Sequence, residues 1–401
     1  MAFITEHASV TISSMNTVIV GGGFAGVRAA LMVDKYKLGK VTLITDVPYF
    51  LHHATLYSTA TGRDKAESII PLENIFMDHP NVKIVIDTMK SVDPKRKLVV
   101  GKDNDYNYDN LIIAIGCVTT YFNIDGMCNH CFGIKSLEEI DDFTTHIRDE
   151  IINNKHLDKN YFVIGAGPTG VELAGALQQH LQDQLRLHKN TYGKIKISIV
   201  EAAPRIVPRS SNTAAKLINK RLRSLGIKVL VGQAVEALDD DTITISGKKY
   251  PTETAIWTSG VANNPFFAKH KELFDLAPNG RVNVNEYLQT TDGIYIIGDN
   301  NTVKYSGTAW PAFDQADFVA KHLRRLRNKR APKRYKPHEP PSGIPIGSGW
   351  GYVEWHGVYL AGKTGFFVRR LIELRGYIKI LNFHAALAAW RAHDLPEITY
   401  K

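Results

Sequence analysis

Residues 161–176 read YFVIGAGPTGVELAGA, an apolar run that passes through three glycines into a segment of small residues. The spacing Gly-x-Gly-x-x-Gly predicts a buried strand, a tight turn and a helix whose N-terminus receives a dinucleotide pyrophosphate. Gly165 would make the turn, Gly167 would let the backbone approach the phosphates, and Gly170 would let the helix pack closely on the strand. A single motif of this kind is a weak signal.

The chain carries the motif twice. Residues 17–30 read TVIVGGGFAGVRAA, again an apolar strand pattern followed by the same glycine spacing and a small-residue helix pattern. The residues expected at this second pyrophosphate are Gly21, Gly23, Phe24, Ala25 and Gly26. Two copies in one chain imply two bound dinucleotides.

Each motif is followed by a predicted strand with an acid at its end, Asp46 after the first motif and Glu201 after the second. An acid at this point typically accepts a hydrogen bond from a ribose hydroxyl. Asp46 could equally cap the end of its strand. Glu201 would repel a 2′-phosphate and so favours NADH over NADPH, although Arg205 and Arg209 close by moderate that preference.

Length and charge bound the remaining possibilities. The 401 residues suffice for two domains and an appendage, and the net charge is +9. Sixteen Lys or Arg and five Asp or Glu lie between Lys321 and Lys401, so the C-terminal part is the basic one. Three cysteines exclude a disulfide framework. We expect neither a secretory signal at the N-terminus nor a membrane-spanning helix, since no run of 18 apolar residues exists.

Four segments then occur in a recognisable order: 21–26, 109–116, 165–172 and 293–299. The last belongs to residues 287–299, which are predicted as a strand ending in Gly298-Asp299. This order resembles the flavoprotein oxidoreductases that bind two dinucleotides. Three further features are similar to the type II NADH dehydrogenases, single-subunit NADH:quinone oxidoreductases that do not pump protons. These are GAGPTGVELAGAL at 165–177 with EAAPR at 201–205, IWTSGV at 256–261, and the basic C-terminal region.

The resemblance covers about residues 16–390 and implies an α/β fold with two Rossmann-like domains and a C-terminal amphipathic helical appendage. The FAD domain would be split by an inserted NAD domain. The expected boundaries are 16–120 for the first part of the FAD-binding domain, 121–257 for the NAD(H)-binding domain, 258–330 for the second part of the FAD-binding domain, and 331–401 for a membrane-associating region.

The resemblance also implies a set of site residues. Non-covalent FAD would lie on the first motif with Asp46, Gly116, Gly298 and Asp299, and NADH on Gly165, Gly167, Thr169, Gly170, Glu201 and Gly260. Glu172 would lie near the nicotinamide and the flavin; the alternative is that its charge complements the helix N-terminus. Bound flavin would accept hydride from NADH and pass two electrons to a quinone.

The acceptor side departs from the family pattern. Where the family has Ala-Gln-x-Ala-x-Gln-Gln, residues 309–315 read AWPAFDQ, so that Trp310 and Asp314 replace glutamines while Gln315 is retained. We expect Trp310, Pro311 and Asp314 beside the flavin on the face away from Glu172, with Trp310 stacking on a quinone, and we count Gln315 among the site residues as well. The alternative is that Trp310 packs the start of a helix.

Two other functions use features of the same sequence. Cys128 and Cys131 form a Cys-x-x-Cys pair that could be the dithiol of a disulfide reductase. A signalling flavoprotein with a nucleic-acid-binding tail is the non-enzymatic alternative, although no recognised nucleic-acid module is present. His52 and His53 have no third ligand at metal spacing, so we expect no metal site.

The C-terminal region has its own pattern. Phe367, Leu371, Leu374, Ile378 and Leu381 recur at helical spacing, with Arg369, Arg375 and Lys379 on other sides and Gly376 as a candidate break. An apolar stripe with basic flanks predicts an interfacial helix on an anionic membrane, the cytoplasmic side of the inner membrane in this family. The alternative is that the stripe covers the protein's own core while the basic residues are solvated. We leave open whether the protein forms a homodimer.

Overall fold

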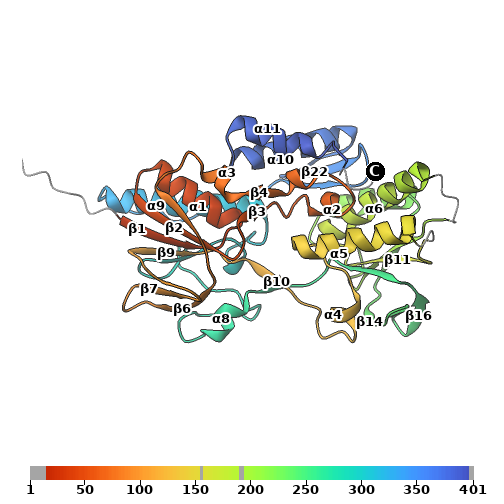
Figure 1. Ribbon diagram of the computed structural model, residues 1–401, viewed down its shortest axis with the longest axis horizontal. Coiled ribbons are helices and arrows are strands. Elements are labelled where there is room, and N and C mark those ends of the chain that lie inside the picture. Colours follow the sequence, from red (N-terminus) through yellow and green to blue (C-terminus); the bar gives the residue numbers. More distant parts are fainter. Residues whose placement is uncertain (1–14, 154–156, 189–193, 397–401) are drawn as a thin grey trace, which may run out of the picture.

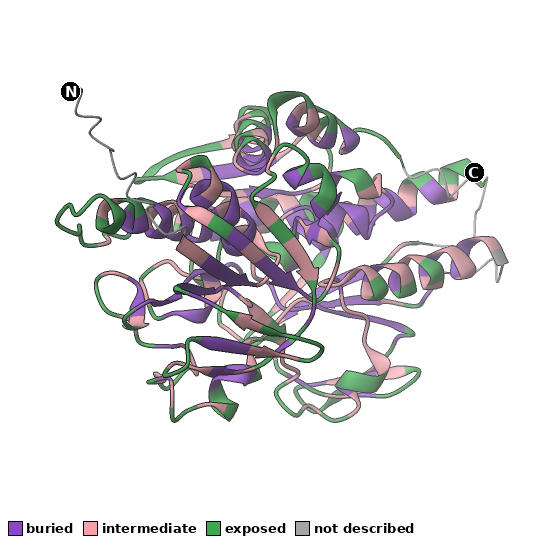
Figure 2. Ribbon diagram, turned by 60° about the vertical axis from the view of Figure 1, so that its left-hand side comes forward, coloured by how far each residue is buried: buried purple, intermediate pink, exposed green. Residues whose placement is uncertain are grey.

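The computed structural model describes residues 15–153, 157–188 and 194–396. Two lobes lie side by side, each built on a mostly parallel sheet, and α10 (Lys363–Ile378) and α11 (Phe383–Ala392) lie along one edge of the pair (Figure 1). The strands of both sheets are largely buried, and exposed residues gather on outer helix faces and turns (Figure 2).

The first lobe contains a six-stranded sheet in the order β19-β20-β9-β1-β2-β5. All neighbouring pairs are parallel except β19–β20. The strands are β1 (Met15–Val20), β2 (Gly39–Thr45), β5 (Val82–Ile86), β9 (Asn110–Ile113), β19 (Gln289–Thr291) and β20 (Ile294–Ile296). The single strand predicted at 287–299 is wrong, because the chain reverses at Gly293, whose φ of +78° suits a turn.

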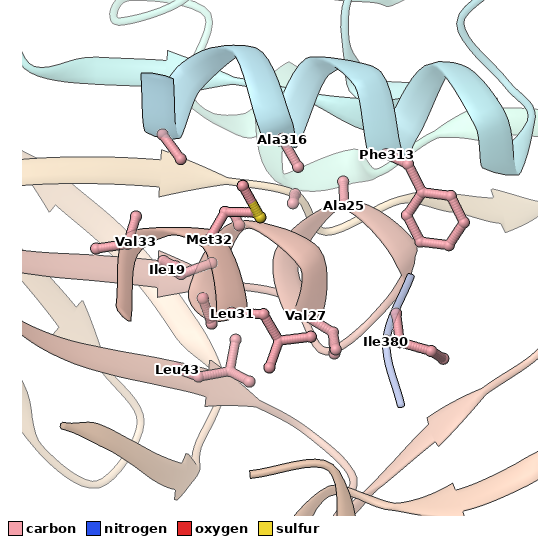
Figure 3. Close-up of a cluster of buried hydrophobic side chains, with 14 of the residues drawn as sticks. Ile19, Ala25, Val27, Leu31, Met32, Val33, Leu43, Phe313, Ala316 and Ile380 are labelled. Atoms are coloured by element: carbon pink, nitrogen blue, oxygen red, sulfur yellow. The ribbon is translucent and has the colours of Figure 1, made fainter. Parts of the chain in front are cut away.

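Helices α1 (Phe24–Lys35) and α9 (Ala309–Arg327) pack on one face of this sheet. Ala25 and Ala316 allow the two helices to approach, and Phe313 and Ile380 close the cluster at the end nearest the first glycine motif (Figure 3). Arg28 and Asp317 join the helices by an ion pair of 2.6 Å. The opposite face is covered by β6 (Met89–Asp93), β7 (Leu98–Gly101), β8 (Asp105–Asn107) and α8 (Pro265–Lys269).

The second lobe contains a parallel four-stranded sheet in the order β13-β12-β11-β17. Its strands are β11 (Tyr161–Ile164), β12 (Ile197–Glu201), β13 (Lys228–Val231) and β17 (Thr254–Trp257). One face carries α5 (Leu137–Arg148), η2 (Asp149–Asn153), α6 (Pro168–Leu187) and α7 (Asn212–Ser224), and the other carries β14 (Val235–Leu238), β15 (Thr242–Ile245) and β16 (Lys248–Pro251).

The chain passes between the lobes through an antiparallel pair, β10 (Cys117–Thr119) and β18 (Val261–Asn263), with α4 (Met127–His130) beyond β10. The second lobe is therefore inserted between β9 and β20 of the first lobe's sheet. This arrangement confirms the predicted fold class of two dinucleotide-binding units, one split by the other.

A short insertion of the first lobe approaches the C-terminal helices. It comprises β3 (Tyr49–Leu51), α2 (Leu56–Thr59), η1 (Lys65–Glu67), β4 (Ile69–Pro71) and α3 (Leu72–Phe76). Ring stacking of His52 on Tyr377 of α10 joins the two parts, with centroids 4.6 Å apart.

The C-terminal region contains a meander that the sequence analysis missed: β21 (Ser342–Pro345), β22 (Gly351–Trp355) and β23 (Val358–Gly362). Helix α10 follows it and runs on through Gly376, so the break considered there is wrong. Within the described ranges no helix has the length and apolar character needed to cross a membrane.

Candidate functional site

The first glycine turn joins β1 to α1. A Cβ on Gly21 would overlap the carbonyl oxygen of Ala114, and one on Gly26 would overlap that of Gly21. By contrast, no protein atom lies within 4 Å of a Cβ built on Gly23, the residue before α1. The N-cap residue Gly23 makes no side-chain hydrogen bond to this helix, so its first N–H groups are left for another acceptor. The turn therefore fits an anionic group at the helix N-terminus.

The second glycine turn repeats this arrangement between β11 and α6. Gly165 has φ +105°, and a Cβ on Gly170 would overlap the carbonyl oxygen of Gly165. A Cβ on Gly167 would meet nothing within 4 Å, and no side chain caps α6. Thr169 is exposed in the first turn of the helix. Both turns thus combine packed outer glycines with an open middle glycine.

The two acids differ in their surroundings. The Glu201 carboxylate accepts hydrogen bonds of 2.8 Å from the backbone N–H groups of Ala166 and Ala203, which hold it beside the second turn. Asp46 is exposed, and the last residue of β2 is the buried Thr45, whose hydroxyl donates to the carbonyl of Val47. The ribose role of Asp46 stays a prediction.

Loops after β9 and β20 meet beside the first turn. The side chain of Asn300 accepts from the Gly116 N–H at 3.0 Å and donates to the Gly116 carbonyl at 2.6 Å. Gly298 lies next to α1, because a Cβ there would be 3.2 Å from that of Ala25. Asp299 follows, partly exposed, and accepts from the Cys117 thiol at 3.4 Å.

Glu172 lies in the second turn of α6 and is buried. Burial raises the pKa of its carboxyl to about 8; Arg369 of α10 opposes this shift and Glu373 adds to it. Glu172 lies beyond the first turn of α6, so the residue at the N-terminus of this helix is Gly167 and not Glu172. The raised pKa favours the neutral carboxyl, a form whose charge cannot complement a helix N-terminus. The role of Glu172 beside the nicotinamide and the flavin stays a prediction.

The residues predicted on the acceptor side begin α9. Trp310 contacts Phe313 edge-on and lies under the guanidinium of Arg375, 5.3 Å from the ring centre. Asp314 is half-buried, and burial raises its pKa.

Gln315 is fully buried and has its partners within the protein. Its carbonyl accepts 2.8 Å bonds from Gly298 N–H and Asn301, and its amide donates to Ser306 at 2.9 Å. These bonds position the Gly298-Asp299 turn. A direct contact of Gln315 with an acceptor stays a prediction.

The remaining predicted residues lie at the crossing between the lobes. Gly260 has φ +64°, and its carbonyl accepts from Lys135 Nζ at 3.3 Å. Cys128 is exposed and Cys131 is partly buried, and both are free thiols. Burial raises the pKa of Cys131 to about 12, whereas a redox dithiol needs a stabilised thiolate. The structure thus gives the disulfide-reductase alternative no support.

The sequence analysis missed a buried charged cluster at α10. Arg369 and Arg370 each lie 3.0 Å from the carboxylate of Glu373, and all three side chains are buried. The expectation that Arg369 is a solvated flank is therefore wrong. The Arg-Arg-x-x-Glu spacing, which places opposite charges three and four residues apart on a helix, was the available signal.

A second pair of polar side chains lies beside this cluster: Glu67, fully buried, and His393, with Nδ1 2.8 Å from Oε2. Glu67, Glu373 and His393 bring possible metal-ligand atoms within 4.8 Å of one another. Two guanidinium groups already neutralise Glu373, which disfavours a divalent cation at this point.

Residues 15–316 match the family described as pyridine nucleotide-disulphide oxidoreductase. The type II NADH:quinone oxidoreductases of Staphylococcus aureus (strain NCTC 8325 / PS 47) and Staphylococcus epidermidis (strain ATCC 35984 / DSM 28319) are each 26% identical to the chain. Each alignment covers 90% of this chain and 95% of the relative.

Solved structures share the fold. NDH2 from Plasmodium falciparum in complex with NADH has a TM-score of 0.84 at 18% identity, covering 95% of this chain and 98% of that one. The sulfide:quinone oxidoreductase from Aquifex aeolicus has a TM-score of 0.73 at 17% identity, covering 96% and 92%. The chain belongs to the pyridine nucleotide-disulphide oxidoreductase family, and the predicted resemblance to its type II NADH dehydrogenases is confirmed.

Proposed function

We propose that the protein is an NADH:quinone oxidoreductase that uses non-covalent FAD and works at a membrane surface without pumping protons. The observation that carries this proposal is the pair of open turns at Gly23 and Gly167, in a chain similar over 90% of its length to type II NADH:quinone oxidoreductases. FAD, when bound, accepts hydride from NADH and passes two electrons to a quinone.

The residues of the first lobe would hold FAD. The N–H groups at the start of α1 would bind its pyrophosphate, with Gly23 leaving the space. Asp299 and Gly116 would bind the ribityl region, because Asn300 and Gln315 hold their loops against the first turn. Asp299 and the Gly116 backbone would thus orient the group.

The residues of the second lobe would hold NADH. The start of α6 would bind the pyrophosphate, and Glu201 would accept from the ribose 2′-hydroxyl. Glu172 lies farther along the same helix, where it would hold its proton close to the nicotinamide and the flavin. NADPH would be disfavoured, because the Glu201 carboxylate repels a 2′-phosphate.

Trp310 and Asp314 would form the acceptor side. They lie at the start of α9. Trp310 contacts α10 through the guanidinium of Arg375, and the charge of Lys379, the residue after α10, acts on Asp314. An aromatic ring here can stack on a quinone ring, which replaces the hydrogen bond of a glutamine.

Helix α10 would bring this side to the membrane. Phe367 and Ile378 of the predicted stripe are exposed, whereas Arg369 and Glu373 face inward. Trp355, Val358 and Tyr359 of the adjoining meander are exposed as well. Exposed apolar side chains on adjoining elements suit the headgroup boundary of a bilayer. The inner membrane, its cytoplasmic side and a homodimer stay predictions from the resemblance.

The test is NADH and NADPH oxidation by the purified flavoprotein with ubiquinone and menaquinone analogues. We expect bound yellow flavin released by acid, a preference for NADH, and quinone reduction. A preparation without flavin, or one whose flavin NADH reduces but no quinone reoxidises, would contradict the proposal.

A further inference from the structure

Six side chains form a continuous hydrogen-bonded line between the first lobe and α11. We call them the polar relay, and they are His52, Thr55, Ser68, Thr59, Glu67 and His393. Five come from one short insertion of the first lobe, and the sixth follows α11 more than 300 residues later. Folding therefore brings the two ends of this line together.

The inner half consists of hydroxyl groups and one imidazole. His52 Nδ1 lies 3.1 Å from Thr55 Oγ1, which lies 2.8 Å from Ser68 Oγ. Ser68 Oγ in turn lies 2.6 Å from Thr59 Oγ1. All four side chains are buried. A hydroxyl both donates and accepts, so a proton can pass along such a line by exchange of hydrogen bonds.

The outer half reaches the surface. Thr59 donates to Glu67 Oε1 at 3.4 Å, the longest step of the relay, and Glu67 Oε2 lies 2.8 Å from His393 Nδ1. Glu67 is fully buried, whereas the His393 side chain is 14% exposed. His393 is therefore the point at which solvent meets the relay.

The inner end lies between the first glycine turn and the C-terminal helices. The His52 ring stacks on Tyr377 and meets Phe24, the first residue of α1, edge-on at 5.2 Å. Phe24 also contacts Phe313 of α9. A Cβ on Gly376 would lie 4.0 Å from His52 Nε2, so the second ring nitrogen faces α10.

Simple packing does not account for these bonds. Thr61, four residues from Tyr57 in the same segment, is also buried, and its hydroxyl donates to the carbonyls of Tyr57 and Ser58. The relay hydroxyls bond to one another as well as to carbonyls. Burying several linked polar groups is costly compared with an apolar core, which suggests a use for the link.

The surroundings of the inner end keep the His52 ring neutral. Glu373, Arg369 and His53 act on His52, and burial lowers the pKa of His52 to about 4, so its ring is neutral and has one lone pair and one N–H. His393 and His52 both act on Glu373, which Arg369 and Arg370 also hold ionised. Tyr57 and Tyr377 face Glu67, and burial keeps both phenols protonated by raising each pKa.

We propose that the polar relay conducts protons between solvent at His393 and the flavin-side face of the protein at His52. The inference rests on the proposed function. Reduction of a quinone to a quinol takes two electrons and two protons. NADH supplies two electrons and one proton as hydride, and one proton must come from solvent. That proton would enter at His393 and leave from His52, and each relay group would end the turnover with the protons it began with.

The test compares Thr59→Val with Thr61→Val, each of which removes one buried hydroxyl from the same segment. Reduction of the bound flavin by NADH consumes no solvent proton, whereas its reoxidation by a water-soluble quinone consumes one. We therefore measure both steps by stopped-flow absorbance, with a pH-indicator dye that reports proton uptake. Thermal unfolding and flavin content show whether each variant is folded and loaded.

We expect Thr59→Val to slow flavin reoxidation and dye-reported proton uptake together by about 100-fold, the scale of a lost proton-transfer group. The rate of flavin reduction by NADH in Thr59→Val should match that of the unmutated protein. So should the rates of both steps in Thr61→Val. His393→Ala should be slowed similarly and rescued by imidazole in the buffer. The relay is wrong if Thr59→Val and Thr61→Val behave alike. An unmutated protein whose flavin no quinone reoxidises would overturn the proposed function, and the relay with it.

Discussion

Arg369 and Glu373 form an ion pair of 3.0 Å on the inner face of α10, with side chains 8% and 2% exposed. Phe367 and Leu371, one turn away on the outer face, are 61% and 44% exposed. The helix thus presents charges to the protein and apolar side chains outward, the reverse of a helix on the surface of a soluble protein.

The inner charges should matter for stability. Glu373→Gln leaves the buried Arg369 without its ion-pair carboxylate and Arg370 with only the longer, 3.6 Å contact to Asp394, and it should lower the free energy of unfolding by about 3–5 kcal/mol. The matched change Glu286→Gln removes an exposed partner of Arg334, 3.6 Å away, and should cost less than about 1 kcal/mol. Urea unfolding of both variants measures the difference. Equal losses of unfolding free energy would contradict a stabilising role for the buried ion pairs of Glu373.

The outer face should bind membranes. Phe367→Ser removes an exposed aromatic side chain that would enter the bilayer interface, and it should weaken binding to anionic vesicles about tenfold, since burial of such a side chain contributes about 1.5–3 kcal/mol. Phe122→Ser is the control, because Phe122 is also 61% exposed but lies near the lobe crossing. Vesicle flotation at low and high salt compares the two variants. Equal flotation would place the membrane contact elsewhere.

Substitution of the open glycine, Gly167, should impair NADH binding, whereas substitution of the packed glycine, Gly170, should impair folding. A Cβ on Gly167 meets no protein atom within 4 Å, so Gly167→Val should change the stability by less than about 0.5 kcal/mol while raising the KM for NADH about tenfold or more. Gly170→Val would overlap the Gly165 carbonyl and should prevent folding of the second lobe. Thermal unfolding and steady-state kinetics check both. Unchanged NADH binding in Gly167→Val would contradict the pyrophosphate site.

Glu172 should make stability depend on pH. Burial raises its pKa from 4.5 to about 8, so between these values the folded state keeps a proton that the unfolded state has lost. Stability therefore falls as pH rises through this range, by up to about 1.4 kcal/mol per unit, and levels off above pH 8. Glu172→Gln should be free of this loss. Melting temperatures at several pH values test it; parallel curves for both proteins would refute it.

Glu201 should set the nucleotide preference. Its carboxylate is held by two backbone N–H groups beside the second turn, where a 2′-phosphate would meet its charge. Glu201→Gln should therefore narrow the ratio of kcat/KM for NADH and NADPH, chiefly by improving NADPH. The same variant should leave flavin content unchanged. Equal kcat/KM for the two nucleotides in the unmutated protein would contradict this role.

Several features could be predicted from sequence because they are local. The glycine spacings at 21–26 and 165–170 encode a strand, a turn and a helix start within a few residues, and both occur where predicted. The meander at 342–362 escaped prediction, because glycine, proline and exposed aromatic residues obscure the alternation that marks strands.

The sequence by itself determined the two glycine motifs for dinucleotides, their order along the chain and the acid that follows the second motif. Only the tertiary structure decided which way α10 faces and what Glu172 and Glu67 meet. Helical spacing places Arg369 and Phe367 on different sides of α10, but it does not say which side is covered. The insertion at 49–76 and α6 supply that cover. Burial and charge at these residues depend on segments up to 326 positions apart, as between Glu67 and His393, and periodicity carries no information over that distance.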